Sequence, residues 1–181
     1  MVGTLIGTAL VSGCSAKQEA NDTLPTAAAE TTEALPEIGP ADFPVPDEAR
    51  TKDAAGAEAF LRYWIKLLNR QRTIPEGQPL RDLAPECTDC WRIAENYEEA
   101  AATGQRYNGG QLRLNDVTEP QLREDEVSIN FGIRQEAVVL IDSSGAPIDA
   151  GMPMQLNLSS GVTLVWSEEN ASWLVKSMTL G

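Results

Sequence analysis

The spacing of apolar residues changes at Gly109-Gly110, from that of an α-helix to that of a β-strand. This change limits the fold classes that the chain can adopt. Before these glycines, residues 53–70 and 89–103 place apolar side chains at the spacing of an α-helix. After them, apolar and polar residues alternate in short runs that turn residues separate. Helices followed by an antiparallel meander predict an α+β domain, in which two or three N-terminal helices pack on a β-sheet.

The helical segments carry recognisable start and stop signals. Thr51 or Asp53 can cap the first segment, and Pro75 breaks it. Gly104 can end the second segment, and residues 80–83 indicate a short helical turn between the two. The residues expected to face the core are Ala57, Phe60, Leu61, Trp64 and Leu68 in the first segment, and Cys90, Ile93, Ala94, Tyr97 and Ala101 in the second.

The β-strands are expected where the pattern alternates, at residues 112–115, 127–133, 137–141, 154–158, 162–166 and 173–178. Turn residues predict reversals at 142–145, 159–161 and 168–170. The run 137–141, AVVLI, is continuously apolar, which predicts a strand covered on both faces. Helices would cover one face and a second copy of the chain the other, so a homodimer through the sheet face is a candidate assembly.

The N-terminus begins with a short uncharged apolar run at residues 2–13. A membrane-spanning helix needs about 20 apolar residues, so this run has instead the length of the apolar part of a signal peptide. Its end, Val11-Ser12-Gly13-Cys14, resembles the bacterial lipobox. The resemblance implies that residues 1–13 are a signal peptide and that Cys14 receives fatty acyl chains. The alternative is an ordinary buried helix or strand with a free cysteine.

Residues 15–50 are rich in Ala, Thr, Glu and Pro and show no hydrophobic periodicity, as is typical of linkers. The predicted organisation is therefore a signal peptide at 1–13, a lipidated cysteine with a disordered acidic linker at 14–50, and an α+β domain at 51–181. Such a linker would hold the domain clear of the membrane, on the outer face of the cell membrane. Within it, Phe43-Pro-Val-Pro46 is expected to be extended and to pack on the domain as a short clasp.

Composition excludes several functions. The formal net charge is −13, so the protein repels nucleic acid and anionic lipid headgroups. Only a covalently attached lipid or an apolar segment could then hold the protein at a membrane, which agrees with a lipid anchor at Cys14. The chain has no histidine, which removes Ser-His-Asp and Cys-His catalysis and histidine metal ligands. We expect no cofactor and no metal site.

Helices before a long curved sheet resemble the cone-shaped nuclear transport factor 2-like fold. Within that fold, the chain is similar to an uncharacterised family of actinobacterial lipoproteins. The features that carry this resemblance are the lipobox, the Pro-containing segment 44–46, the helix 56–69 and the pair Cys87/Cys90. The resemblance implies a location and a fold; the family has no established activity.

The pair Cys87-Thr-Asp-Cys90 allows three interpretations. It could be a redox-active dithiol at a helix start, or half of a zinc site. Two further zinc ligands are missing, however, and no strand precedes the pair as in a thioredoxin-like motif. An exported protein lies in an oxidising compartment, and cysteines three apart in a first helical turn lie within bonding range. We therefore favour a structural disulfide between Cys87 and Cys90.

Six aromatic residues are candidates to line a pocket inside the cone, although plain core packing is the simpler interpretation of them. These residues are Trp64, Trp91, Tyr97, Tyr107, Phe131 and Trp166. No catalytic residue can be named. The favoured function is a non-catalytic binding or interaction domain with an unknown ligand. The alternatives are a small isomerase-like or hydrolase-like enzyme, which a deep cavity beside a buried Asp, Glu or Tyr would favour, and a dimeric assembly protein of the cell envelope.

Overall fold

The computed structural model describes residues 35–181. The predicted signal peptide, Cys14 and the first part of the predicted linker lie outside the described residues. A short 3-10 turn, η1 (Asp47–Ala49), precedes the helices α1 (Ala54–Thr73), α2 (Gln78–Leu83) and α3 (Thr88–Ala102). The strands are β1 (Arg106–Gly109), β2 (Leu112–Val117), β3 (Gln121–Arg123), β4 (Glu126–Gln135), β5 (Val138–Ile141), β6 (Gln155–Ser167) and β7 (Ser172–Thr179).

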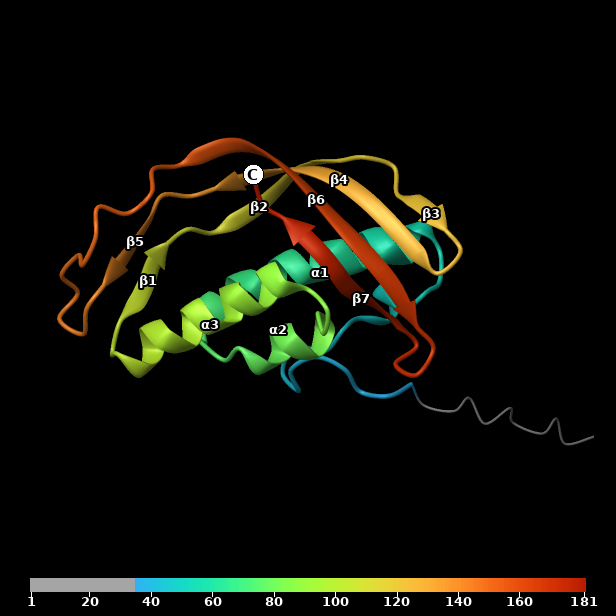
Figure 1. Cartoon of the computed structure of the whole chain (residues 1–181), viewed down its shortest axis with the longest axis horizontal. Helices are drawn as coiled ribbons and strands as arrows, with labels where there is room; N and C mark the ends of the chain where they lie inside the picture. The colour runs from blue at the N-terminus through green and yellow to red at the C-terminus, as the bar shows by residue number, and fades with distance from the viewer. Residues whose placement is uncertain (1–34) are drawn as a thin grey trace, which may run out of the picture. The chain divides into compact units, whose positions relative to one another are not determined.

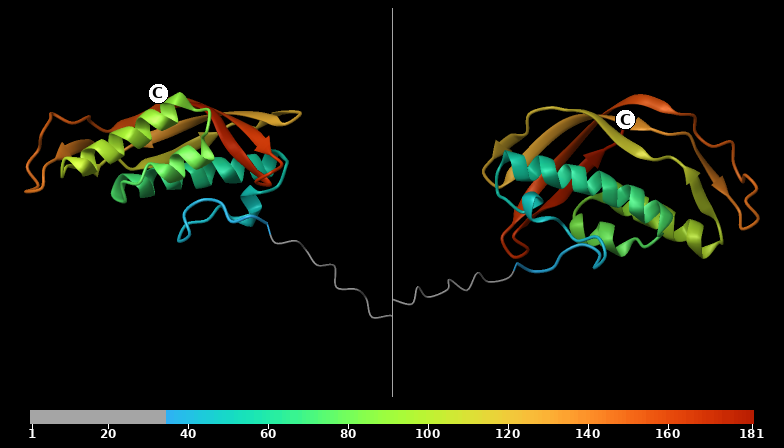
Figure 2. Two further views of the ribbon diagram at one scale, coloured as in Figure 1. Left: turned by 60° about the horizontal axis from the view of Figure 1, so that its bottom comes forward. Right: turned by 180° about the vertical axis from the view of Figure 1, so that it is seen from behind.

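The strands form two antiparallel sheets. The main sheet has the order β2-β4-β6-β7, and β3 also pairs with β4. Strands β1 and β5 form a separate two-stranded sheet, which we call the β1–β5 arm. Figure 1 shows the main sheet curving over the helices, and Figure 2 shows α1 and α3 on the same face of it. The α+β class and the order of helices and strands agree with the sequence-based prediction.

Helix α1 forms where the apolar stripe and its cap predict it. The Asp53 carboxylate accepts a hydrogen bond from the backbone N–H of Gly56 at 2.7 Å and so caps the helix. The helix ends at Thr73 because Pro75 biases Ile74 away from the helical conformation. On its inner face Phe60, Leu61, Trp64 and Leu68 are at most 1% exposed.

The core lies between this face of α1 and the inner face of the main sheet. Along β4, every second residue from Val127 to Ile133 is buried while the residues that alternate with them are more exposed, as the alternating pattern predicts. On the opposite face β4 presents polar side chains such as Ser128 and Asn130. Dimerisation through the sheet face stays a prediction. Measuring the molecular mass of the protein in solution would distinguish a monomer from a dimer.

The reversal predicted at residues 159–161 is wrong, because β6 runs unbroken through them. Ser159-Ser-Gly161 pairs with residues 130–132 of β4 in continuous antiparallel register. The alternation also continues across the segment, since Ser160 and Val162 are both buried. Small polar residues are typical of turns, but here the long partner strand β4 keeps them extended.

The sheet also begins earlier than the alternating pattern predicts. Strand β1 begins at Arg106, ends at Gly109 and pairs with β5, so that Gly109 lies opposite Val138. Gly109 and Gly110 have φ values of +81° and +75°, in the left-handed region. A Cβ atom on Gly109 would lie 2.1 Å from the carbonyl oxygen of Ala137. The two glycines therefore allow the chain to bend between the arm and the main sheet.

The folded part of the chain also begins ahead of residue 51. Val45 and Ala49 are 4% and 0% exposed, and the ring of Phe43 stacks on Tyr63 of α1 with 5.2 Å between centroids. Asp42 pairs with Arg70 at 2.6 Å. The segment 42–49 is therefore part of the packed domain, because its few apolar residues fit against α1. The packing of Phe43 and Val45 agrees with the clasp predicted at Phe43-Pro-Val-Pro46, whereas the composition had indicated a linker up to residue 50.

Candidate functional site

A half-open cavity of about 200 Å³ lies where the β1–β5 arm meets the helices. Its apolar wall consists of Leu68 of α1, Ile93 of α3, Leu112, Val138, Met152 and Leu180. Its polar groups come from Arg72, Asn96, Tyr97, Tyr107, Gly110 and Gln135. An apolar wall with a few polar groups is the usual composition of a small-molecule site.

Arg72 is the charged residue of this cavity. Its guanidinium donates hydrogen bonds to the carbonyl oxygen of Gly110 and, at 3.1 Å, to the Oδ1 atom of Asn69. No carboxylate of residues 35–181 lies within ion-pair distance of it. Burial lowers the pKa of Arg72, an effect that the influence of Tyr97 and Glu136 opposes. An arginine nevertheless stays charged at physiological pH.

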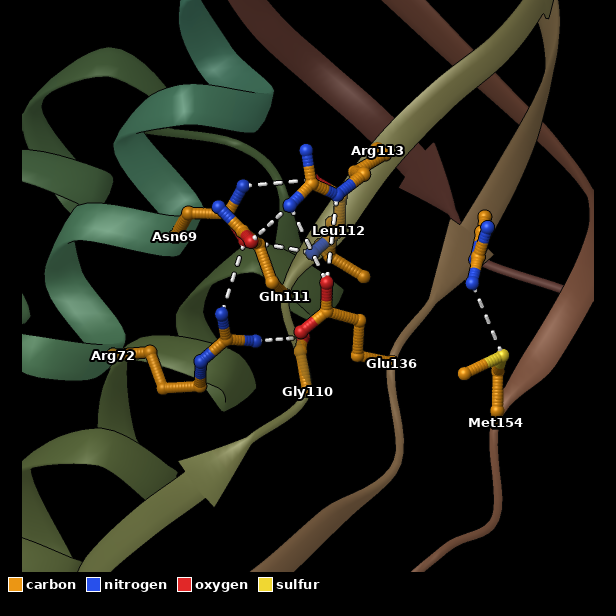
Figure 3. Close-up of polar contacts among 9 residues, drawn as sticks. Asn69, Arg72, Gly110, Gln111, Leu112, Arg113, Glu136 and Met154 are labelled. Carbon is orange, nitrogen blue, oxygen red and sulfur yellow. Dashed lines mark hydrogen bonds and ion pairs between the residues drawn. The ribbon is translucent and has the colours of Figure 1, made fainter.

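Asn69 connects the same turn of α1 to the start of β2. Its Nδ2 atom donates to the carbonyl oxygen of Leu112, and its Oδ1 atom accepts from the N–H of Leu112, both at 2.8 Å. Figure 3 shows these contacts beside those of Arg72. The side-chain amide thus takes the place of a neighbouring strand at Leu112. Asn69 and Arg72 together hold the bend at Gly110 against the helix.

Two tyrosines form the aromatic side of the cavity. The rings of Tyr97 and Tyr107 meet edge to face with 5.6 Å between centroids. Burial raises the pKa of Tyr97, and Arg72 opposes this shift. Burial also raises the pKa of Tyr107, and the carboxylates of Asp149 and Glu99 raise it further. Both phenols are therefore neutral at neutral pH, and each can donate or accept a hydrogen bond.

The other four aromatic residues proposed from the sequence do not line this cavity. Trp64 and Phe131 lie in the core, at 0% and 4% exposure. Trp91 is 42% exposed and donates to the carbonyl oxygen of Ala84. Trp166 packs edge to face against Trp173. Of the six residues, only Tyr97 and Tyr107 are brought together at the cavity.

Arg72 and Asn69 are the site residues that the sequence analysis missed. The first helix was expected to end at residue 70, whereas α1 continues to Thr73. Arg72 follows Leu68 by four residues, and Leu68 follows Trp64 by four, so Arg72 lies on the buried stripe. A charged residue in line with a buried stripe is a signal that could have identified this site.

The structure confirms a disulfide between Cys87 and Cys90, whose Cα atoms lie 5.2 Å apart. Both cysteines are buried, at 2% and 0% exposure. The Cys87 sulfur accepts the backbone N–H of Cys90 at 3.2 Å and so caps α3. Within residues 35–181, no three Cys, Asp or Glu side chains are grouped so that they could hold a metal ion. The geometry therefore agrees with a structural crosslink.

Reduction of this crosslink is expected to lower the free energy of unfolding by about 2 kcal/mol, since the bond closes a loop of only four residues. The measurement is chemical denaturation with and without a thiol reductant. The C87A/C90A double variant serves as the control, and its stability should not respond to the reductant. Equal stability of the reduced and oxidised wild-type protein would contradict a stabilising role.

Comparisons with known proteins find similarity at the level of structure. The chain matches no known protein-family profile and no curated protein sequence. The intermembrane space region of the chloroplast protein ARC6 superposes with a TM-score of 0.50 at 15% identity, covering 72% of this chain and 97% of that region. A variant of Rd1NTF2_05 superposes with a TM-score of 0.42 at 12% identity, covering 69% of this chain and 99% of its own. For Aln2 from a Streptomyces species the TM-score is 0.42 at 13% identity, with 67% of this chain and 85% of that chain covered.

At these identities the likeness concerns the fold alone. The three helices, their position on one face and the antiparallel sheet define an α+β domain. This arrangement agrees with the α+β class that the sequence predicted, with three helices packed on an antiparallel sheet.

Proposed function

We propose that the chain is a non-catalytic binding protein of the cell envelope, which takes a small ligand into the cavity between α1, α3 and the β1–β5 arm. The observation that carries this proposal is the cavity itself. An apolar wall surrounds one fixed cation and two neutral phenols. These groups can bind and orient a molecule without reacting with it.

One observation favours the alternative of an enzyme. Tyr97 lines the cavity, and a buried Asp, Glu or Tyr at a cavity is the feature expected of an enzyme with this fold. Acid–base catalysis needs a group whose pKa lies near the working pH. Among the described residues, those that line the cavity and titrate are Arg72, Tyr97 and Tyr107, and none is a carboxylate. Burial raises the pKa of both phenols, away from neutral pH. Binding is therefore the function that this geometry supports better.

A variant whose side chain fills the cavity tests the proposed binding function. The full-length I93W variant places an indole into the cavity from α3, whereas E95W places the same group on the exposed face of that helix. We expect small apolar fragments, screened by ligand-observed NMR, to bind the wild-type protein and E95W and to lose binding to I93W. Equal binding to both variants would contradict the cavity as the site.

We further propose that a lipid on Cys14 anchors this domain to the outer face of the cell membrane, as in actinobacterial lipoproteins. Support comes from the lipobox at residues 11–14 and from the linker composition that follows it. No helix within residues 35–181 is long and apolar enough to span a bilayer. Two acyl chains suffice to hold a protein stably at a membrane.

Mass spectrometry of the protein from its native membrane fraction tests the anchor. We expect mature chains that begin at Cys14 and carry added acyl mass. The C14A variant should lose this mass and leave the membrane fraction. Chains that keep residues 1–13 and an unmodified thiol would contradict the anchor, although the binding function of the domain would stand.

A further inference from the structure

We infer that the ligand is a small apolar molecule with one carboxylate, which binds the guanidinium of Arg72 while its apolar part lies against the cavity wall. This inference rests on the proposed binding function and names its ligand class. It follows from the charge, the spare hydrogen-bond donors and the size of the cavity.

The charge of the cavity contrasts with that of the protein. The chain has a formal net charge of −13, yet within the described part of the chain Arg72 is the one charged residue that lines this cavity. Its neighbour Glu136 pairs with Arg113 at 3.4 Å, so that carboxylate already has a cation of its own. An anion entering the cavity would therefore meet a positive charge that has no ion-pair partner among residues 35–181.

The guanidinium also has donors to spare. An arginine has five N–H donors, and the structure shows Arg72 donating to two acceptors, the oxygens of Gly110 and Asn69. Both acceptors are neutral, so they fix the plane of the guanidinium without cancelling its charge. A carboxylate can accept two parallel bonds from such a plane. Because the arginine is already held in place, binding costs less side-chain entropy.

The apolar wall sets the size of the ligand. The cavity volume is about 200 Å³, and an apolar cavity of about 150 Å³ can hold benzene. The site thus accommodates one ring or a short alkyl chain beside the carboxylate. Leu68 and Ile93 offer aliphatic contacts, and the rings of Tyr97 and Tyr107 offer an aromatic surface.

Matched acids and amides test this inference. Calorimetric titration of the full-length protein would compare phenylacetate with phenylacetamide and hexanoate with hexanamide. Each pair shares its apolar part and differs in charge. Because hydrogen bonds to charged groups are stronger than neutral ones, we expect each acid to bind at least about tenfold more tightly than its amide.

Variants assign this preference to Arg72. R72Q should remove the preference for the acid, and R72K, which keeps a positive charge, should retain part of it. R134Q removes an exposed arginine from β4 and should bind as the wild-type protein does. Thermal unfolding of each variant shows whether the fold is intact. If R72Q does not fold, the acid–amide comparison on the wild-type protein still decides.

The outcomes separate the two proposals. Equal affinity for acid and amide, with both excluded by I93W, would overturn the carboxylate ligand and leave the binding cavity standing. A preference for the acid that R72Q keeps would place the anion elsewhere and overturn the role of Arg72. Absence of binding by all four compounds would overturn both the ligand class and the cavity as its site.

Discussion

Replacement of Trp64 by Ala is expected to lower the free energy of unfolding by about 3–5 kcal/mol, the usual cost of removing a large buried aromatic side chain. Trp64 is 0% exposed and lies in the core between α1 and the sheet. Its indole N–H also donates to the sulfur of Met178 at 3.2 Å. Truncation therefore removes both apolar contacts and a contact from α1 to β7. Urea denaturation followed by circular dichroism measures the change.

The matched control is W91A, which makes the same substitution on α3. Trp91 is 42% exposed, and its indole donates one hydrogen bond, to the carbonyl oxygen of Ala84. Its loss should cost about 1–2 kcal/mol, the sum of one hydrogen bond and partial burial. Equal losses in W64A and W91A would contradict the assignment of Trp64 to the core.

Replacement of Gly109 by Ala is expected to lower the free energy of unfolding by about 3–4 kcal/mol, because a left-handed alanine is strained and backbone must also shift. The new Cβ atom would meet the carbonyl oxygen of Ala137 at 2.1 Å. This clash lies between the two strands at the base of the arm. The same variant should bind cavity ligands more weakly, since Gly110, Val138 and Tyr107 would move.

G104A separates conformational strain from the clash. Gly104 has a φ of +72°, close to the +81° of Gly109, but a Cβ atom there has no neighbour within 4 Å. Its substitution should cost only the left-handed strain, about 1–2 kcal/mol, and should leave ligand affinity unchanged. If G109A proved no more costly than G104A, the bend at Gly109 would not depend on the close approach of Ala137.

The sequence predicted best the elements that its local pattern determines. The stripe from Phe60 to Leu68 and the cap at Asp53 identified α1, and the alternation around Ile129 identified β4. It failed where tertiary pairing overrides local preference. Ser159-Ser-Gly161 has the composition of a turn but stays extended because β4 pairs with it throughout. By contrast, the clasp expected at Phe43-Pro-Val-Pro46 does pack on the domain, through Phe43 and Val45, although the composition around it is that of a linker.

The cavity was predictable only in part. Tyr97 and Tyr107 were among the proposed pocket residues because aromatic side chains are typical of such sites. Trp64 was proposed with them but is buried in the core, and the cavity lies further along α1, at Leu68 and Arg72. Its position depends on the bend at Gly109-Gly110, which brings the arm over the helices. A bend of this kind depends on long-range contacts that a local pattern does not contain.

A crystal structure of the full-length protein grown with phenylacetate tests the central claim most directly. The account predicts density for the carboxylate within hydrogen-bond distance of the Arg72 guanidinium, and for the ring against Tyr97 and Ile93. Density for phenylacetate on another surface, with side chains of the arm filling the cavity, would contradict it.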